Sequence, residues 1–378
     1  MVGLRLRDSG IEFPGQTGLR NSITDVAGVR VGHSTIISGE PEAADGAVVR
    51  TGVTVVVPSD DHPWLRPLFA SHHVLNGNGE MTGLHWVSES GLLTSYIGLT
   101  NTASVGVVRD ALVSHEIDSR GPAGHFWSLP VVAETYDGVL NDIGGMHVES
   151  AHVFDAIRRA SVLVEEGSVG GGTGMVCHGF KGGIGTSSRV LDTAGDRYTV
   201  GVLVQANHGA RKRLRILGHP IGEIINDERV QIPRMGQPGG NDGSGSIIAV
   251  VATDAPLLPH QLKGLAQRVS LGIGRTGGLG EYTSGDIFFA FSTANRSLTP
   301  VGVGTAPAGV LKLEMLSQSA LSPLYEAVVE ATEEAIVNSM TSSTTMVGKG
   351  GVVVPGIPGD LLLELLGGAG SGPGSQVY

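Results

Sequence analysis

The sequence predicts an α/β sandwich in which helices cover stacked β-sheets. Short runs of β-branched and apolar residues, typical of buried strands, outnumber the helical stretches along the chain. Two of the helical stretches, at 259–272 and 323–340, lie C-terminal to strand-like runs, so the two kinds of element are mixed. With 378 residues and 40% hydrophobic content, the chain is long enough for a large core in one big domain or two.

Strand-like runs and glycine-rich turns dominate the first part of the chain. A run of β-branched residues ended by proline predicts a strand, and a polar segment directly after an apolar run lies at a strand end. The stretch Thr100–Asp110 could begin either a buried helix or a strand. The other segments are the strands Ile23–His33, Gly52–Pro58 and Pro130–Ala133, and the glycine-rich turn Asn76–Gly83 with its one carboxylate.

Three segments have the apolar periodicity of helices. Apolar residues at i, i+4 and i+7 predict a helix over 149–161 with two arginines on its wet side. Pro259 can occupy the first position of the helix over 259–272, and Gly272 is expected to end it. The long helix over 323–340 comes last.

The second half of the chain alternates strands with segments rich in glycine and polar residues. Gly167–Gly185 is expected to be a glycine-dense connector, and 218–245, rich in Gly, Pro, Asn and Asp, a long mobile linker. The expected strands are Tyr198–Gln205, Ser246–Ala252 and Ser284–Phe291.

Composition excludes several classes of function. The net charge of −11 argues against nucleic acid as the main partner. No apolar run approaches about 18 residues, so no segment is expected to span a membrane, and the N-terminus has no apolar signal-peptide core. The single cysteine, Cys177, excludes an intrachain disulfide and fits a reducing compartment, so we expect a cytoplasmic protein.

Several short motifs lack the context that their chemistry requires. Gly272–Gly277 matches G-x-G-x-x-G, but a helix precedes it where a dinucleotide site needs a strand. The 13 histidines include no H-E-x-x-H and no Cys/His cluster at zinc spacing, so no metal site is expected, and no cofactor motif is present. Cys177 beside His178 is interpreted as a buried small residue, and the basic run Arg211–Arg215 as a solvated strand edge.

The remaining chemical signal is a set of polar residues at strand ends, where a rigid sheet can present side chains. Ser246 opens a strand directly after Gly245, and breaking the bond between them would give Ser246 a free α-amine beside its Oγ nucleophile. The alternative is a flexible loop that enters a strand. The other strand-end residues are Glu134 and Tyr136, Asn207, and Ser284 with Asp286.

With these segments in view, the chain resembles the self-processing N-terminal-serine aminopeptidases, which include the L-aminopeptidase/D-Ala-esterase/amidase and the β-peptidyl aminopeptidases. The most specific match is the Gly-Ser-Ile-Ile strand start followed by Ala252–Pro256. The resemblance extends in order over Asn21–His33, Asn76–Gly83, Thr100–Ala111, Glu134–Asp137, Gln205–Gly209, Gly245–Pro256, Ser284–Ala294 and Glu330–Gly348.

The resemblance implies a four-layer αββα sandwich similar to N-terminal-nucleophile hydrolases, with different connectivity. It implies a single domain over 1–378 that is cleaved into an α chain (1–245) and a β chain (246–378), with the linker 218–245 before the cleavage site. It also implies a homotetramer of αβ units. The implied roles are Ser246 as nucleophile, Asn207 in the oxyanion hole, Ser284 and Asp286 beside the nucleophile, and Glu134 with Tyr136 at the substrate's amino group.

The expected function is that of a self-cleaving serine aminopeptidase or amidase. It would release N-terminal amino acids from small peptides, amides or esters through an acyl-enzyme on Ser246, without metal or cofactor. Two alternatives stay open: an acyltransferase of N-terminal-nucleophile type, and an uncleaved scaffold without catalytic activity. The intact set of polar strand ends argues against the scaffold.

Overall fold

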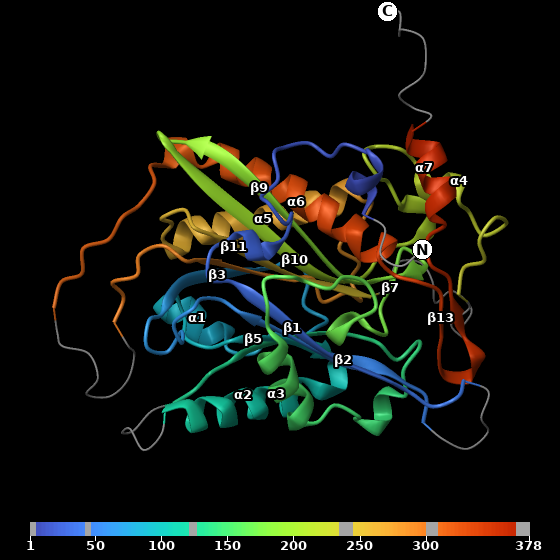
Figure 1. Cartoon of the computed structure of the whole chain (residues 1–378), viewed down its shortest axis with the longest axis horizontal. Helices are drawn as coiled ribbons and strands as arrows, with labels where there is room; N and C mark the ends of the chain where they lie inside the picture. Colours follow the sequence, from blue (N-terminus) through green and yellow to red (C-terminus); the bar gives the residue numbers. More distant parts are fainter. Residues whose placement is uncertain (1–4, 42–46, 121–126, 234–244, 300–308, 368–378) are drawn as a thin grey trace, which may run out of the picture.

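The described residues of the computed structural model form four stacked layers, helix–sheet–sheet–helix (Figure 1). The structure describes residues 5–41, 47–120, 127–233, 245–299 and 309–367. Two sheets stack face to face in the middle, and a pair of long helices covers the outer face of each. The αββα sandwich expected from the sequence is therefore confirmed.

A six-stranded sheet contains the strand that opens with Ser246. Its strand order is β4-β3-β12-β11-β10-β9, with β11 and β12 parallel and the other neighbouring pairs antiparallel. The strands are β3 (Leu68–Val74), β4 (Leu92–Leu93), β9 (Gly183–Thr193), β10 (Asp196–Asn207), β11 (Ser246–Thr253) and β12 (Ile287–Ser292).

The second sheet has four strands in the order β1-β2-β5-β6. Strands β5 and β6 are parallel, and the other two neighbouring pairs are antiparallel. The strands are β1 (Arg30–Ser38), β2 (Val49–Val57), β5 (Ile97–Asn101) and β6 (Val131–Thr135).

Helices α5 (Pro259–Arg275) and α6 (Ser322–Thr341) cover the six-stranded sheet, and α2 (Val105–Arg120) and α3 (Ser150–Arg159) cover the four-stranded sheet (Figure 1). The shorter helices are α1 (Leu84–Ser90), α4 (Ile221–Ile224) and α7 (Gly359–Gly367). Two small hairpins pair β7 (Val176–Cys177) with β8 (Phe180–Lys181) and β13 (Met346–Val347) with β14 (Val353–Val354). Short 3₁₀ helices occur at Leu6–Ser9, Ile23–Asp25, Thr102–Ser104, Ile143–Gly145, Gly170–Gly172, Arg211–Arg213, Gln318–Ala320 and Lys349–Gly351.

Strand β11 shows why its sequence is a continuous apolar run. Side chains alternate between the two faces of a strand, so both faces of a central strand must be apolar when both are covered. Ile247 and Val251 belong to the core under α5 and α6, whereas Ile248 and Val250 belong to the core between the two sheets. All eight residues of β11 are buried, so Ser246 is the first residue of a strand that is covered on both faces.

Several boundaries differ from those expected from the sequence. The expectation that Gly272 ends its helix was wrong, because α5 continues to Arg275. A Cβ on Gly272 would lie 2.5 Å from Thr332 Cβ of α6, so this glycine allows two helices to pack closely. The strand expected from Ile23 begins only at Arg30, after a 3₁₀ turn capped by Ser22.

The glycine-dense and linker segments contain more structure than their composition indicates. Gly167–Gly185 contains β7, β8 and the start of β9. Within the linker expected over 218–245, residues 221–224 form α4, and Ile221 and Ile225 are buried in the core. Residues 234–244 of that linker lie outside the described part.

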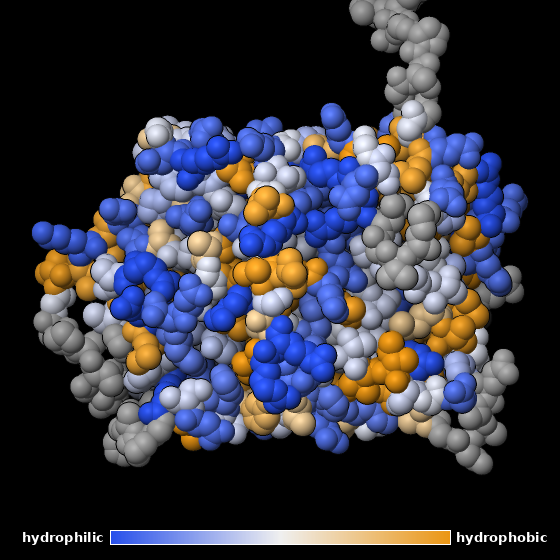
Figure 2. Space-filling view, viewed as in Figure 1, coloured by the Kyte–Doolittle hydropathy of each residue, from blue (hydrophilic) through white to orange (hydrophobic). Residues whose placement is uncertain are grey.

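The surface view of one face shows apolar patches separated by polar residues (Figure 2). Among the described helices, none is long and apolar enough to cross a membrane. Arg211 was expected on a solvated strand edge, but it is buried, stacks over the Phe180 ring and donates to four backbone carbonyls. That expectation was wrong for Arg211 because its guanidinium replaces missing backbone hydrogen bonds in a turn.

Candidate active site

The strand topology brings the predicted polar strand ends to one edge of the six-stranded sheet. Asn207 ends β10 and pairs with Ser246, which starts the antiparallel β11. Because β12 runs parallel to β11, its N-terminal end lies at the same edge and is preceded by Ser284 and Asp286. All four residues are buried, with 2–5% of each exposed.

The segment before β12 contacts both the Ser246 hydroxyl and the next residue of β11. The backbone N–H of Gly285 donates to Ser246 Oγ at 2.9 Å. The next residue of the strand, Ile247, donates its N–H to Asp286 Oδ1 at 3.0 Å. Strand β11 is therefore held to the segment that precedes β12 by the side chain of its first residue, Ser246, and by the backbone amide of its second, Ile247.

Ser284 lies between the carboxylate of Asp286 and the carbonyl of Gly245. Its Oγ is 2.5 Å from Asp286 Oδ1 and also lies in short contact with the Gly245 carbonyl oxygen. A hydroxyl has one proton to donate, so it can bond only one of these acceptors at a time unless Asp286 is itself protonated. Burial raises the pKa of Asp286, against the lowering effect of the hydrogen bonds from Ser284, Ile247 and Asn76.

Gly245 has a backbone conformation that explains why glycine precedes the serine. Its φ is +138°, in a region that residues with a Cβ rarely adopt. A Cβ at this position would lie 2.0 Å from the backbone oxygen of Asn207. The Gly-Ser pair is thus a steric requirement of this junction.

The Asn207 side chain is held from two sides. Its Oδ1 accepts the backbone N–H of Val176 at 2.7 Å, and its Nδ2 donates to the backbone oxygen of Tyr136 at 2.9 Å. An amide nitrogen has two hydrogens, so the second can be donated to another acceptor. A Cβ built on Gly245 would lie 3.4 Å from Asn207 Nδ2, which places this amide beside the Gly-Ser junction.

Glu134 comes from the other sheet but lies close to the same edge. It is 3% exposed, and its carboxylate accepts the backbone N–H of Glu80 at 3.1 Å and the hydroxyl of Thr102. Burial raises its pKa, although these two hydrogen bonds lower it. A Cβ on Gly79 would lie 2.8 Å from Gly285 Cα and 3.2 Å from Glu134 Oε1, so Gly79 bridges the nucleophile's loop and this carboxylate.

Tyr136 meets the site through its backbone. Its carbonyl accepts from Asn207, while the residue is 50% exposed and its side chain lies toward solvent. The structure thus brings the side chains of Ser246, Asn207, Ser284, Asp286 and Glu134 to one sheet edge, whereas Tyr136 contacts this site through its backbone carbonyl.

Asn76 is a site residue that the sequence reasoning missed. Its Nδ2 donates to Asp286 Oδ2 at 3.0 Å, and its Oδ1 accepts the Asp286 N–H at 2.5 Å. Asn76 follows β3, whose last residue, Val74, pairs with Ile287 at the start of β12. The available signal was an asparagine within a glycine-rich turn after a strand, which the sequence reasoning had interpreted only as a turn.

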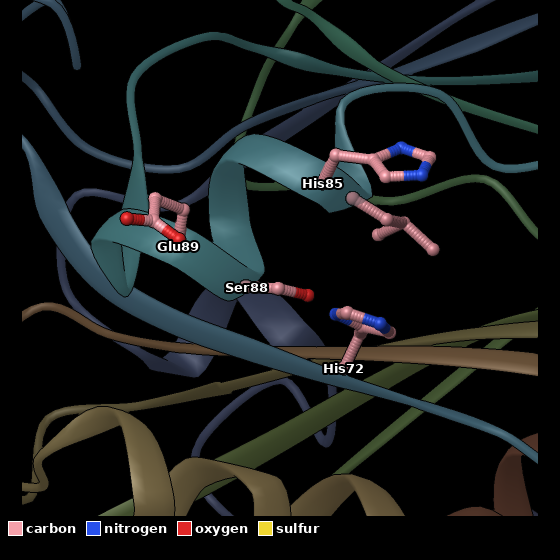
Figure 3. A pocket seen from close by; sticks show the side chains of 5 residues that line it. His72, His85, Ser88 and Glu89 are labelled. Atoms are coloured by element: carbon pink, nitrogen blue, oxygen red, sulfur yellow. The ribbon is translucent and has the colours of Figure 1, made fainter.

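One group of described residues has the side chains and spacing to hold a metal ion: Cys177, His178 and His208. Local sequence spacing could not show it, because His208 directly follows β10, 30 residues along the chain from His178. Separately, a hollow of about 390 Å³ beside β3 and α1 is lined by His72, Leu84, His85, Ser88 and Glu89 (Figure 3). Its lining includes none of the strand-end residues, so the hollow is not part of the candidate site.

Comparison with known proteins adds three kinds of evidence. The model of peptidase family S58 matches residues 21–354. The chain is 48% identical to the β-peptidyl aminopeptidase BapA of Sphingosinicella microcystinivorans, over 94% of this chain and 90% of the relative. A second BapA, from Sphingosinicella xenopeptidilytica, is 43% identical over 97% of this chain and 92% of the relative.

Solved structures agree with these relatives. The β-aminopeptidase of a Burkholderia species superimposes with a TM-score of 0.88 at 47% identity, covering 98% of this chain and 100% of that one. The L-aminopeptidase D-Ala-esterase/amidase of Ochrobactrum anthropi gives a TM-score of 0.87 at 44% identity, covering 97% and 99%. The latter is a prototype of the serine aminopeptidases and a variant of the Ntn hydrolase fold.

Proposed function

The chain belongs to peptidase family S58 and is a serine aminopeptidase, and we propose that it matures by cutting its own Gly245–Ser246 bond. The observation that carries this proposal is the packing at the junction. The strand-opening serine receives a hydrogen bond from Gly285, while Ser284 lies against the Gly245 carbonyl oxygen. A nucleophile and a donor for the developing oxyanion thus meet at one peptide bond.

Self-cleavage follows in two balanced steps. Ser246 Oγ attacks the Gly245 carbonyl carbon and the C–N bond breaks, so the acyl group moves from nitrogen to oxygen as an ester and the proton ends on the released amine. Ser284 donates to the Gly245 oxygen as charge develops there. Water then hydrolyses the ester, leaving a carboxylate on Gly245 and a free α-amine on Ser246.

The free amine supplies the base for the mature reaction. An α-amine titrates near pH 7.7–8.0, so a large fraction is neutral at neutral pH, and a positioned base contributes about 10²–10⁴-fold. Ser246 attacks the substrate carbonyl and forms an acyl-enzyme that water hydrolyses. The second hydrogen of Asn207 Nδ2 donates to the oxyanion, a kind of contact worth roughly 10²–10³-fold in rate.

Glu134 restricts the substrate to molecules with a free amino terminus. Its buried carboxylate pairs with the substrate ammonium, a charge-assisted contact that an internal peptide bond cannot make. The Tyr136 carbonyl, two residues along the chain, accepts from Asn207, and we propose that the Tyr136 ring lines the same position. We propose small peptides, amino-acid amides and esters as substrates, and the similarity to β-peptidyl aminopeptidases favours a β-amino acid as the amino-terminal residue.

Intact-mass analysis and N-terminal sequencing of the purified protein test the proposal. We expect two fragments, one ending at Gly245 and one starting at Ser246 and holding the 246–378 segment. The Ser246→Ala variant should stay one chain and be inactive. A new N-terminus at any residue other than Ser246 contradicts the assignment, and a single wild-type band near 38.9 kDa supports the uncleaved scaffold.

A side-by-side assay of amides and esters of L-, D- and β-amino acids tests the substrate class. Adding amine acceptors separates hydrolysis from acyl transfer, because an acyltransferase would yield the acylated amine as its main product. The homotetramer of αβ units stays a prediction from the resemblance, and the cytoplasmic location stays a prediction from the single cysteine. Sedimentation analysis of the cleaved protein measures the first of these.

A further inference from the structure

Cys177, His178 and His208 form a buried cluster directly behind Asn207. The first two are fully buried, and His208 is 4% exposed. One possible ligand atom from each side chain lies within 4.8 Å of the other two, and Cys177 Sγ is 3.9 Å from His208 Nδ1. A thiol and two imidazoles are the ligands that thiophilic cations such as Zn²⁺ prefer.

Two imidazole nitrogens of this cluster lack partners. His178 Nδ1 lies 3.2 Å from the Ala210 carbonyl, which can only accept, so Nδ1 carries the proton and Nε2 the lone pair. That arrangement is usual for metal-binding histidines, whose other nitrogen donates to a carbonyl. His178 Nε2 and His208 Nε2 are buried without a hydrogen-bond partner in the described part of the chain, and a cation bound at either atom would remove the cost at that atom.

We propose that Cys177, His178 and His208 bind one Zn²⁺ ion, and that this ion inhibits the peptidase by displacing Asn207. The site is separate from the catalytic residues proposed above, whose mechanism needs no metal. The binding step stands on the cluster alone, whereas the inhibition rests on the oxyanion role proposed for Asn207.

Zinc must displace the thiol proton of Cys177, which is released to solvent. Two buried cations near the cluster oppose a bound ion: Lys181 Nζ donates to the backbone carbonyls of Gly172, Met175 and Gly182, and Arg211 donates to the backbone carbonyl of His178. The negative charge that Cys177 gains as a thiolate offsets part of this repulsion.

The coupling to Asn207 is short and runs through the backbone. Asn207 directly precedes His208, whose carbonyl accepts the His178 N–H at 2.7 Å. Val176, next to Cys177, donates to Asn207 Oδ1 at 2.7 Å. Tetrahedral zinc holds such ligand atoms about 3.3–3.6 Å apart, so binding contracts the cluster and moves the two segments that position the Asn207 amide.

Such a movement affects the reaction because an oxyanion donor must be placed within a few tenths of an ångström. A misplacement of about 1 Å can cost on the order of 100-fold in rate. Zinc binding should therefore lower kcat, and leave the contacts of Glu134 with the substrate amine unchanged.

Binding is measured first on the Ser246→Ala protein, which presents one uncleaved and inactive chain. After overnight equilibration with zinc chloride, equilibrium dialysis with metal analysis should find one ion per chain. Cys177 is the only cysteine and is fully buried, so its slow alkylation reports on local opening at this site alone. Bound zinc should slow this alkylation on the order of tenfold or more. The Cys177→Ala variant should bind zinc at least about tenfold more weakly, whereas His85→Ala, in the hollow beside α1, should bind as the parent does.

Inhibition is then measured on the cleaved wild-type enzyme. Zinc should lower kcat with a midpoint equal to the binding constant, a chelator should restore the rate, and Cys177→Ala should keep its activity when zinc is added. The proposed zinc site would be refuted by any of three results: no zinc binding, full zinc binding by Cys177→Ala, or an alkylation rate that zinc does not change. Binding without inhibition would overturn the coupling, whereas cleavage of the Ser246→Ala chain would instead refute the proposed function. If Cys177→Ala does not fold, the effect of zinc on the alkylation rate of the Ser246→Ala protein still tests whether Cys177 is a ligand.

Discussion

Replacing Glu134 with glutamine separates substrate recognition from self-cleavage. Glu134→Gln keeps the size of the side chain and can still accept the Glu80 N–H, but it loses the negative charge. The internal Gly245–Ser246 bond presents no free amine. Self-cleavage should therefore proceed as in the wild type, whereas hydrolysis of amino-acid amides should slow.

The size of the loss follows from the contact that is removed. Glu134 is 3% exposed, so an ammonium paired with it is largely shielded from water. A hydrogen bond to a charged group contributes about 1.5–3 kcal/mol, which corresponds to a loss of on the order of 10- to 100-fold in kcat/KM. Acetylating the substrate amine removes the same contact, so the losses from the variant and from acetylation should not add.

The raised pKa of Glu134 also predicts how the variant's thermal stability and the wild type's substrate preference depend on charge and pH. A group whose pKa is raised by folding contributes stability below its unfolded pKa and loses it as the pH rises through the folded pKa. At neutral pH the ionised carboxylate therefore destabilises the fold, and Glu134→Gln should melt at the same or a slightly higher temperature. The preference of the wild type for free-amine over acetylated substrates should also fall as the pH drops through this raised pKa.

The assay compares kcat/KM for an amide and its acetylated form in both proteins, with intact mass and thermal melting on the same samples. Gln205, which is buried and bonded to Thr100 and Thr135 behind the site, offers a matched control. Gln205→Glu should impair folding and leave the free-amine preference of any folded protein intact. A cleaved Glu134→Gln enzyme that still prefers free amines by the full margin refutes this role for Glu134.

The remaining predictions concern the junction, its support and metals. Gly245→Ala should prevent self-cleavage, visible as one band on a denaturing gel, because its Cβ would lie 2.0 Å from the Asn207 backbone oxygen; normal processing would contradict this. Asn76→Ala should lower kcat on the order of tenfold with KM nearly unchanged, by freeing Asp286, whereas the exposed Asn78→Ala should not. Dialysis against a chelator should leave amide hydrolysis intact; activity that is lost and then restored by zinc would show catalytic metal.

The strand-end residues could be found from the sequence because each is a polar residue next to an apolar run that predicts a buried strand. Ser246 is the first residue of β11, directly before the apolar run Ile247–Ala252, and Asn207 is the last residue of β10, so each is visible in the sequence as a polar residue at the end of an apolar run. The roles came from the resemblance, since a polar strand end does not by itself specify a reaction.

The sequence does not predict the roles of residues whose partners lie far away along the chain. Asn76 supports Asp286 only because β3 pairs antiparallel with β12, and Cys177 meets His208 only because the β7 hairpin packs beside the end of β10. Neither pairing leaves a trace in local spacing. Gly272 was misjudged for a related reason, because its neighbour Thr332 lies on another helix. Local patterns predict elements, whereas these positions are decided by packing between elements.

The mixed strand directions of the six-stranded sheet explain how one short edge can hold the whole site. Antiparallel pairing of β10 with β11 places the end of one strand beside the start of the next, so Asn207 faces Ser246. Parallel pairing of β11 with β12 then adds Asp286 from a second strand start. In an all-antiparallel sheet the start of β12 would lie at the opposite edge, and Ser246 would lose the carboxylate and the Gly285 amide together. The one parallel pair in this sheet is therefore what makes the Gly-Ser junction a candidate for chemistry. The hydrogen bond from Asn207 to the Tyr136 carbonyl joins this edge to the segment of the other sheet that carries Glu134.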